Sequence, residues 1–115
     1  MQVAATAFTE RVEDLEGKAE LTHEEVAEIV GASARTVGRW RNGSVVPQPD
    51  ARKRLLELAY VADELAKVLK RGDRNAWLFA PNRLLDHDTP AERIAQGDYR
   101  AVMALIEALA DGVVV

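Results

Sequence analysis

Apolar side chains recur along this chain at intervals of three and four residues, the spacing of one face of an α-helix. The longest stripe lies in residues 50–69 and holds Leu55, Leu58, Ala59, Ala62, Leu65, Ala66 and Leu69. A second stripe, near the C-terminus, holds Val102, Leu105, Ile106 and Leu109. No stretch alternates apolar and polar residues as a half-buried strand does. The pattern therefore predicts an all-α fold.

Capping residues predict a short helix over residues 22–30. In the stretch LTHEEV, Thr22 can cap the helix and Glu25 completes a capping box. Leu21 and Val26 have the spacing of a hydrophobic staple across the same helix start. Gly31 follows in the position of a left-handed C-cap, which ends the helix.

A second short helix is predicted directly after the first. Ser33 can cap it, Val37 and Trp40 share its inner face, and Asn42 with Gly43 ends it. Two short helices joined by about three residues that include a glycine are typical of a helix-turn-helix.

The N-terminal part of the chain holds one weaker helix before this pair. Residues 4–16 place Val12 and Leu15 on a face near Phe8, and Gly17 is predicted to end this helix. After the pair, two prolines in SVVPQPD break the chain before the long helix, which closes near Gly72.

Three further helices are predicted in the C-terminal part. A short turn of helix lies in DRNAWLFA, and DTPAER carries a second capping box that begins at Thr89. The last helix starts at Gly97-Asp98, with Asp98 as its cap, and ends at Gly112. We divide the chain into residues 1–48, the N-terminal helix and helix-turn-helix, and residues 49–115, the long helix and a C-terminal domain.

Length and composition narrow the class of protein. A chain of 115 residues is one compact domain or two very small ones. It has no cysteine, which removes disulfides and fits a reducing cytoplasm, where we expect the protein to act. No apolar run approaches the roughly 18 residues of a membrane helix. The N-terminus lacks a basic start and a long apolar core, so no signal peptide is expected.

Positive charge is concentrated in one fifth of an acidic chain. The net charge is −4 overall, but residues 33–54 carry six bases and one acid. Residues 1–32 carry eight acids and two bases, and residues 55–115 carry ten acids and seven bases. Because salt screens charges beyond roughly 8–10 Å, a local basic patch can bind phosphate on a protein that is acidic overall.

The basic patch coincides with the second helix of the helix-turn-helix, which predicts DNA binding. The start of that helix enters the major groove in this motif, where arginine suits guanine edges and phosphates. The candidate DNA-binding residues are Ser33, Arg35, Thr36, Arg39, Arg41, Arg52 and Lys53, the last three for backbone contacts. The alternatives are solvated arginines and a purely structural helix pair.

The C-terminal half must serve another purpose, because a DNA-binding unit needs only some 50 residues. It is rich in aromatic residues and arginine, which are enriched at interface hot spots, and we interpret it as a helical interaction module. The alternative is that Trp77, Phe79 and Leu84 simply fill the core.

The stretch from Trp77 to Gly112 resembles the toxin-binding domain of the Xre/MbcA/ParS antitoxins. The matching positions are Trp77, Pro81, Asn82, Leu84, Pro90, Gly97, Val102, Leu105 and Gly112. After Leu84, many members have glycine where this chain has Leu85-Asp86-His87. With the helix-turn-helix, the resemblance covers roughly residues 20–115, and it is strongest to the mycobacterial members.

The resemblance implies an antitoxin. Such proteins pair with a RES-domain toxin that destroys cellular NAD, close its active-site cleft with their C-terminal domain, and are thought to bind their own promoter. They usually self-associate, so a homodimer that also assembles with the toxin is expected. The implied toxin-binding residues are Trp77, Asn82, Arg83, Tyr99, Asp111, Gly112, Val113, Val114 and Val115. The apolar end would enter the cleft as a plug; the alternative is a frayed terminus.

An enzyme is not expected, nor is a metal or cofactor. Asp86-His87-Asp88 is interpreted as a solvated loop, and the chain has neither a phosphate-binding glycine loop nor a nucleophile elbow. Three hypotheses remain open. They are an antitoxin that binds toxin and DNA, a stand-alone transcription regulator whose C-terminal helices dimerise, and a scaffold with a relic helix-turn-helix.

Overall fold

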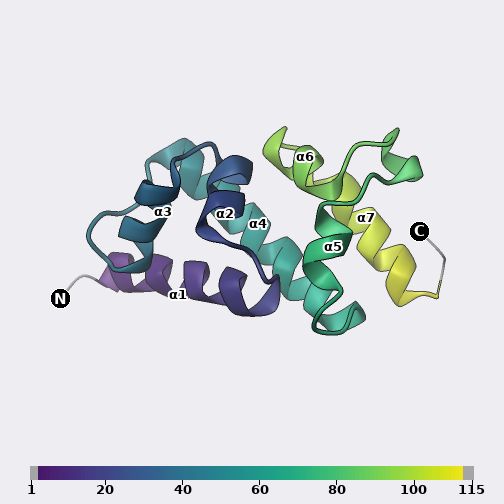
Figure 1. The fold of residues 1–115 in the computed structure, drawn as a ribbon, viewed down its shortest axis with the longest axis horizontal. Helices are drawn as coiled ribbons and strands as arrows, with labels where there is room; N and C mark the ends of the chain where they lie inside the picture. The colour runs from purple at the N-terminus through teal and green to yellow at the C-terminus, as the bar shows by residue number, and fades with distance from the viewer. Residues whose placement is uncertain (1–2, 113–115) are drawn as a thin grey trace.

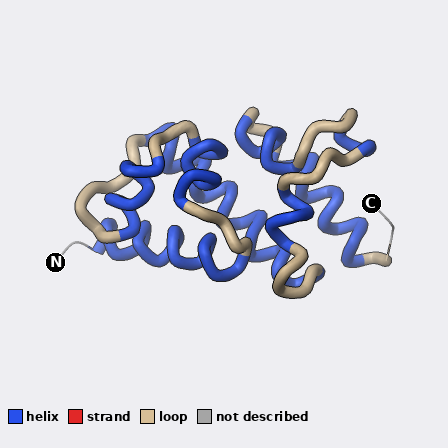
Figure 2. The backbone as a smooth tube through the Cα atoms, viewed as in Figure 1, coloured by secondary structure: helices blue, strands red, loops and turns tan. Residues whose placement is uncertain are grey.

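The computed structural model describes residues 3–112, which form seven α-helices, one 3₁₀ turn and no strand (Figures 1 and 2). The elements are α1 (Val3–Lys18), α2 (His23–Val30), α3 (Ala34–Arg41), α4 (Pro49–Val68), α5 (Arg74–Leu78), η1 (Arg83–Leu85), α6 (Pro90–Ala95) and α7 (Tyr99–Ala110). The all-α prediction is confirmed. No helix in this range is both long and apolar enough to cross a membrane.

The caps predicted for the helix pair are present. The Thr22 hydroxyl accepts the Glu25 amide at 3.1 Å, and the Glu25 carboxylate accepts the Thr22 amide at 2.9 Å. Gly31 adopts φ +78°, the left-handed conformation that ends α2. Ser33 accepts the Thr36 amide at 3.0 Å and begins α3. The three residues between α2 and α3 therefore form the tight turn that the sequence predicted.

Two predicted helix boundaries are wrong. Gly17 does not end α1, which continues to Lys18 and stops because Glu20 adopts the left-handed conformation, φ +62°. The Leu15 carbonyl accepts the amides of both Ala19 and Leu21 at 3.2 Å there, an arrangement in which glycine is usual at the left-handed position. At the other end of the chain, Asp98 makes no side-chain cap on α7, because Arg93 donates to its carboxylate instead.

One continuous hydrophobic core runs through both halves of the chain. Leu58 on α4 is fully buried, and Trp40 on α3 is only 2 % exposed. Trp77 and Phe79 pack against this core, but Leu84 is 51 % exposed. The alternative that all three residues fill the core is therefore wrong for Leu84, which leaves an apolar side chain on the surface of η1.

The molecule is elongated, with principal extents of 45 × 23 × 19 Å. The helix-turn-helix lies towards one end, and α7 finishes at the other, as does the loop between α5 and α6 (Figure 1). The long helix α4 connects the two ends. The predicted DNA-binding and toxin-binding regions are thus well separated in space.

Candidate functional site

The outer face of α3 presents the predicted recognition residues. Arg35 and Arg39 are exposed, and neither forms an ion pair within residues 3–112. The opposite face buries Val37 completely and Trp40 almost completely. Ser33 also donates its hydroxyl to the Thr36 oxygen at 2.9 Å, which leaves the Thr36 hydroxyl hydrogen available. The amphipathic division of α3 is therefore the one that the spacing predicted.

The remaining basic candidates differ in how free their charge is. Arg41 turns back to α1, where its guanidinium lies 3.2 Å from both Glu13 and Glu16. Arg52 and Lys53 are exposed at the start of α4 and form no ion pair with the described residues. The charge available to phosphate on this surface thus comes mainly from the exposed bases of α3 and α4.

The C-terminal candidates surround a shallow surface hollow. It has a volume of about 360 Å³ and is lined by Trp77, Ala80, Pro81, Asn82, Arg83 and His87. Trp77 comes from α5, and its indole N–H is buried without an acceptor among the described residues. Arg83 is exposed and has no ion-pair partner in the described chain. The structure therefore brings three of the predicted toxin-binding residues together.

Hydrogen bonds hold the loop of residues 82–88 in one conformation. The Asn82 side chain accepts the Leu84 amide at 2.9 Å and begins η1. The Asn82 backbone donates to Asp88 at 3.0 Å and accepts from His87 at 2.9 Å. Asp86 and His87 both have positive φ, +55° and +71°, so this turn is strained for side chains larger than glycine. The loop expected to be merely solvated is an ordered part of the hollow.

Arg93 on α6 secures this loop, and sequence reasoning missed it. Its guanidinium donates to the Asp88 carboxylate at 2.8 Å, the Leu85 carbonyl at 2.8 Å and the Asp98 carboxylate at 3.2 Å. The hydrogen bond to Asp88 is the main reason that the pKa of Arg93 is raised. The acids lie five residues before and after Arg93, a spacing that no helical pairing rule detects.

Arg74 and Lys18 join the two halves behind the hollow. The Arg74 guanidinium donates to the carbonyls of Leu69, Lys18 and Ala66 at 2.9–3.1 Å, which satisfies the ends of α1 and α4. Lys18 donates to Asp63 at 2.9 Å, and this hydrogen bond raises the pKa of the Lys18 ammonium. The helix that carries Trp77 is therefore anchored to the N-terminal half.

Tyr99 and the C-terminal residues lie away from the hollow. Tyr99 packs edge-on against Tyr60 of α4, with ring centroids 6.4 Å apart and planes at 82°. Asp111 and Gly112 are exposed at the end of α7, about 18 Å beyond its first residue at 1.5 Å per residue. The predicted plug residues Val113, Val114 and Val115 fall outside the described residues. Within residues 3–112, no group of three or more histidine and acidic side chains could hold a metal ion.

The chain was compared with known proteins, and no protein-family model matches it. It is 57 % identical to the mycobacterial cidal antitoxin MbcA of Mycobacterium tuberculosis and of Mycobacterium bovis, over 83 % of this chain and 84 % of theirs. It is 33 % identical to a second M. tuberculosis protein, described as the probable mycobacterial cidal antitoxin Rv3188, over 80 % of this chain and 78 % of that one.

A solved structure also matches the fold. The crystal structure of the M. tuberculosis MbcT-MbcA toxin-antitoxin complex contains a chain that superposes with a TM-score of 0.84 at 51 % identity. The match covers 93 % of this chain and 96 % of that chain. The likeness therefore includes the helix-turn-helix as well as the C-terminal helices.

Proposed function

The chain belongs to the family of the mycobacterial cidal antitoxin MbcA, and from this we propose that it is the antitoxin of a toxin–antitoxin pair. Its partner is a RES-domain toxin that degrades NAD, and its C-terminal part blocks the active-site cleft of that toxin. The observation that carries the proposal is the TM-score of 0.84, at 51 % identity, to a chain from a toxin–antitoxin complex. The resemblance on residues 77–112 supplies the toxin class.

We propose that the toxin contacts the end of the molecule opposite the helix-turn-helix. The hollow around Trp77, with Asn82 and Arg83, lies at that end, and α7 finishes there (Figure 1). Arg83 and Leu84 are exposed on a loop that hydrogen bonds hold in place, so binding costs little ordering entropy. Residues 111–115 extend this surface beyond α7. Tyr99, on another face, is not included.

Replacing Arg83 by glutamate tests this surface. Because Arg83 is exposed and unpaired within the described chain, Arg83→Glu should weaken toxin binding about 30-fold, as expected for an interface arginine. The free energy of unfolding should stay within about 0.5 kcal/mol of the parent. The measurement is titration calorimetry with the purified toxin, together with NAD levels in cells that express both proteins.

Arg71→Glu is the matched control, since Arg71 is an exposed arginine outside the hollow. It makes the same change in net charge and should bind toxin normally. Equal loss in both variants would point to a general charge effect and remove Arg83 from the site. A parent chain that does not bind the toxin and leaves NAD degradation unchanged would refute the antitoxin proposal itself.

We also propose that residues 1–48 bind promoter DNA and that a homodimer presents two copies of α3. The exposed Arg35 and Arg39, with Arg52 and Lys53 at the start of α4, support this role. Autoregulation by the antitoxin, in the cytoplasm where promoter and toxin meet, follows from it. The exposed bases on α3 and α4 also favour the second candidate, a stand-alone regulator.

Removing two arginines from α3 tests DNA binding. Arg35→Ala with Arg39→Ala should lower affinity for the chain's own promoter about 100-fold and reduce the salt slope by about 2, one for each lost phosphate or base-edge contact. Fluorescence anisotropy over a range of salt concentrations measures both quantities.

The control removes Arg71 and Arg100, two exposed arginines on other elements. It should leave the affinity and the slope close to those of the parent. If the α3 variant retains both values, the recognition-helix assignment is wrong. DNA binding without any toxin binding would favour the stand-alone regulator.

A further inference from the structure

Two large apolar side chains lie exposed, one turn apart, on the long helix. Leu56 is 43 % exposed and Tyr60 is 51 % exposed, and their spacing of four residues places them on the same face of α4. The opposite face of α4 is fully buried at Leu55, Leu58 and Leu65. The helix therefore has a second apolar stripe that the fold itself does not cover.

The neighbouring helix α7 extends this stripe into a broader surface. Tyr99 contacts the edge of the Tyr60 ring, and the Arg100 guanidinium lies 5.5 Å from the centre of the Tyr99 ring. A groove between the two helices continues past Met103 towards Val68. We call Leu56, Tyr60, Tyr99 and Met103 the α4–α7 patch.

The charges on either side of the patch have opposite signs. Arg52 and Lys53 lie one turn before Leu56 on the exposed side of α4, and both are unpaired within residues 3–112. Asp63 and Glu64 lie one turn after Tyr60 on the same side. The exposed face of α4 is thus basic, then apolar, then acidic along its length.

We propose that a second copy of this chain covers the α4–α7 patch, with the two α4 helices antiparallel about a two-fold axis at the level of Leu58. In such a pairing, residue i contacts j while j contacts i. Leu56 then lies over Tyr60 of the other copy, and Lys53 lies beside its Glu64. Arg52 comes opposite Asp63 on the other flank. A face that is basic at one end and acidic at the other is complementary to itself in this orientation.

The available surface is large enough for such a dimer. The 20 residues of α4 are about 30 Å long, and two helices side by side are about 20 Å wide, giving about 600 Å² per copy. Standard interfaces bury about 800 Å² per partner, so the patch with its flanking charges approaches that size.

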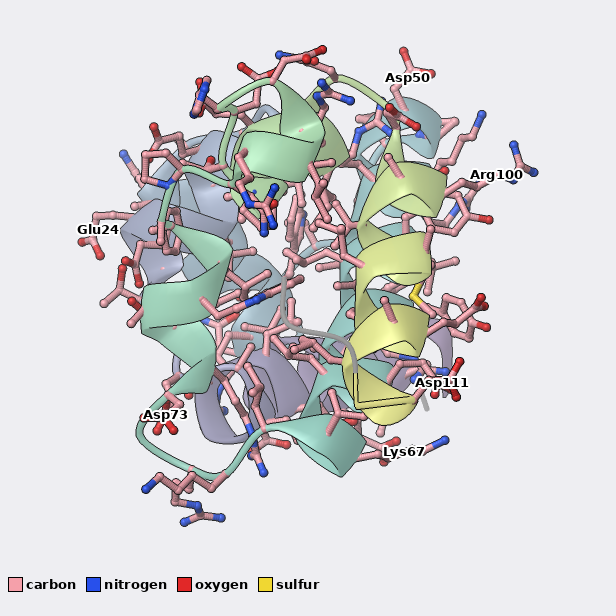
Figure 3. All side chains as sticks on the ribbon, turned by 90° about the vertical axis from the view of Figure 1, so that its right-hand side faces the viewer. Glu24, Asp50, Lys67, Asp73, Arg100 and Asp111 are labelled. Carbon is pink, nitrogen blue, oxygen red and sulfur yellow. The ribbon has the colours of Figure 1, made fainter. Side chains whose placement is uncertain are left out.

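The patch is separate from the proposed toxin surface. Seen along the long axis in Figure 3, Arg100 and Lys67 project from one side of the molecule and Asp73, just before α5, from the other. Trp77 lies on α5, so one chain can bind the toxin and a second copy together. The inference names the surface of the homodimer proposed above, and its test does not depend on toxin binding.

Sedimentation equilibrium of the purified full chain tests the inference. The parent should dimerise, and Leu56→Glu should raise the dimer dissociation constant at least about 30-fold, because it buries an unpaired charge. Val46→Glu is the control, since Val46 is equally exposed, at 43 %, but lies before α4. It should leave dimerisation unchanged.

Reversal of the flanking charges tests the orientation. Lys53→Glu and Glu64→Lys should each weaken the dimer about 5–10-fold, and the double variant should recover most of the affinity. Recovery is specific to a pairing in which residues 53 and 64 of different copies meet.

Three results would overturn the inference. They are a parent that stays monomeric at 100 µM or above, roughly the limit of a meaningful weak contact, a Leu56→Glu variant that dimerises normally, and charge reversals whose effects merely add. Loss of toxin binding in Leu56→Glu, with dimerisation intact, would assign the patch to the toxin instead.

Discussion

Ending the chain after Asp111 is expected to lower its affinity for the toxin at least about 100-fold, or about 2.7 kcal/mol. The deleted residues, 112–115, include three valines, and burying one valine side chain contributes about 1.5 kcal/mol or more. A short apolar end can enter an active-site cleft that a folded surface cannot reach. Titration calorimetry with the toxin, and protection of NAD in cells, measure the loss.

The fold should not change, because α7 ends at Ala110 and its buried residues, Val102, Leu105 and Ile106, all precede the deletion. The unfolding free energy of the truncated chain should lie within about 0.5 kcal/mol of the parent. Homodimerisation through the α4–α7 patch should also persist.

Changing all three terminal valines to serine separates the apolar contribution from mere length. This variant keeps every backbone atom and should lose nearly as much affinity as the truncation. Full affinity in the serine variant would show that length alone matters. A truncated chain that neutralises the toxin as well as the parent would leave the hollow around Trp77 as the whole binding surface.

Trp40→Ala is expected to destabilise the protein by about 3–5 kcal/mol, a large part of the 5–15 kcal/mol typical of a domain. Trp40 is 2 % exposed and is the largest fully buried side chain in the described core. Its loss leaves a cavity among α1, α2 and α3, and its carbonyl accepts the Thr9 hydroxyl of α1 at 3.1 Å. Urea unfolding followed by circular dichroism gives the free energy.

Leu84→Ala is the control, because Leu84 is a large apolar residue that is 51 % exposed. It should cost less than about 0.5 kcal/mol. Since one core joins both halves, Trp40→Ala should unfold the C-terminal helices together with α3 in a single transition. Two separate transitions would show that the helix-turn-helix folds independently of residues 49–115.

Local features of this protein followed from the sequence. Both capping boxes, the left-handed Gly31 and the buried pair Val37 and Trp40 depend on residues no more than four positions apart. Hydrogen bonding and helical periodicity at that range act almost independently of the rest of the chain. The helix pair and its basic outer face could therefore be predicted before the fold was known.

The contacts that assemble the candidate surfaces depended on tertiary structure. Arg74 reaches a carbonyl 56 positions away, and Arg41 pairs with Glu16 on α1, 25 positions away. Glu20 takes the left-handed position at the end of α1, and its carboxylate accepts the Gly72 amide at 2.7 Å. No local spacing rule relates such residues, since only the packing of the helices brings them together.

The exposure of the α4–α7 patch also required the fold. The sequence of α4 has apolar residues on more than one face, and periodicity alone does not say which face the protein covers. Helices α1, α2, α6 and α7 pack against α4 and bury Leu55, Leu58 and Leu65, while Leu56 and Tyr60 remain exposed. The sequence by itself determined which segments are helices and where most of them end. Which apolar stripe is core and which is surface was decided by the neighbouring helices, because burial is a property of their arrangement.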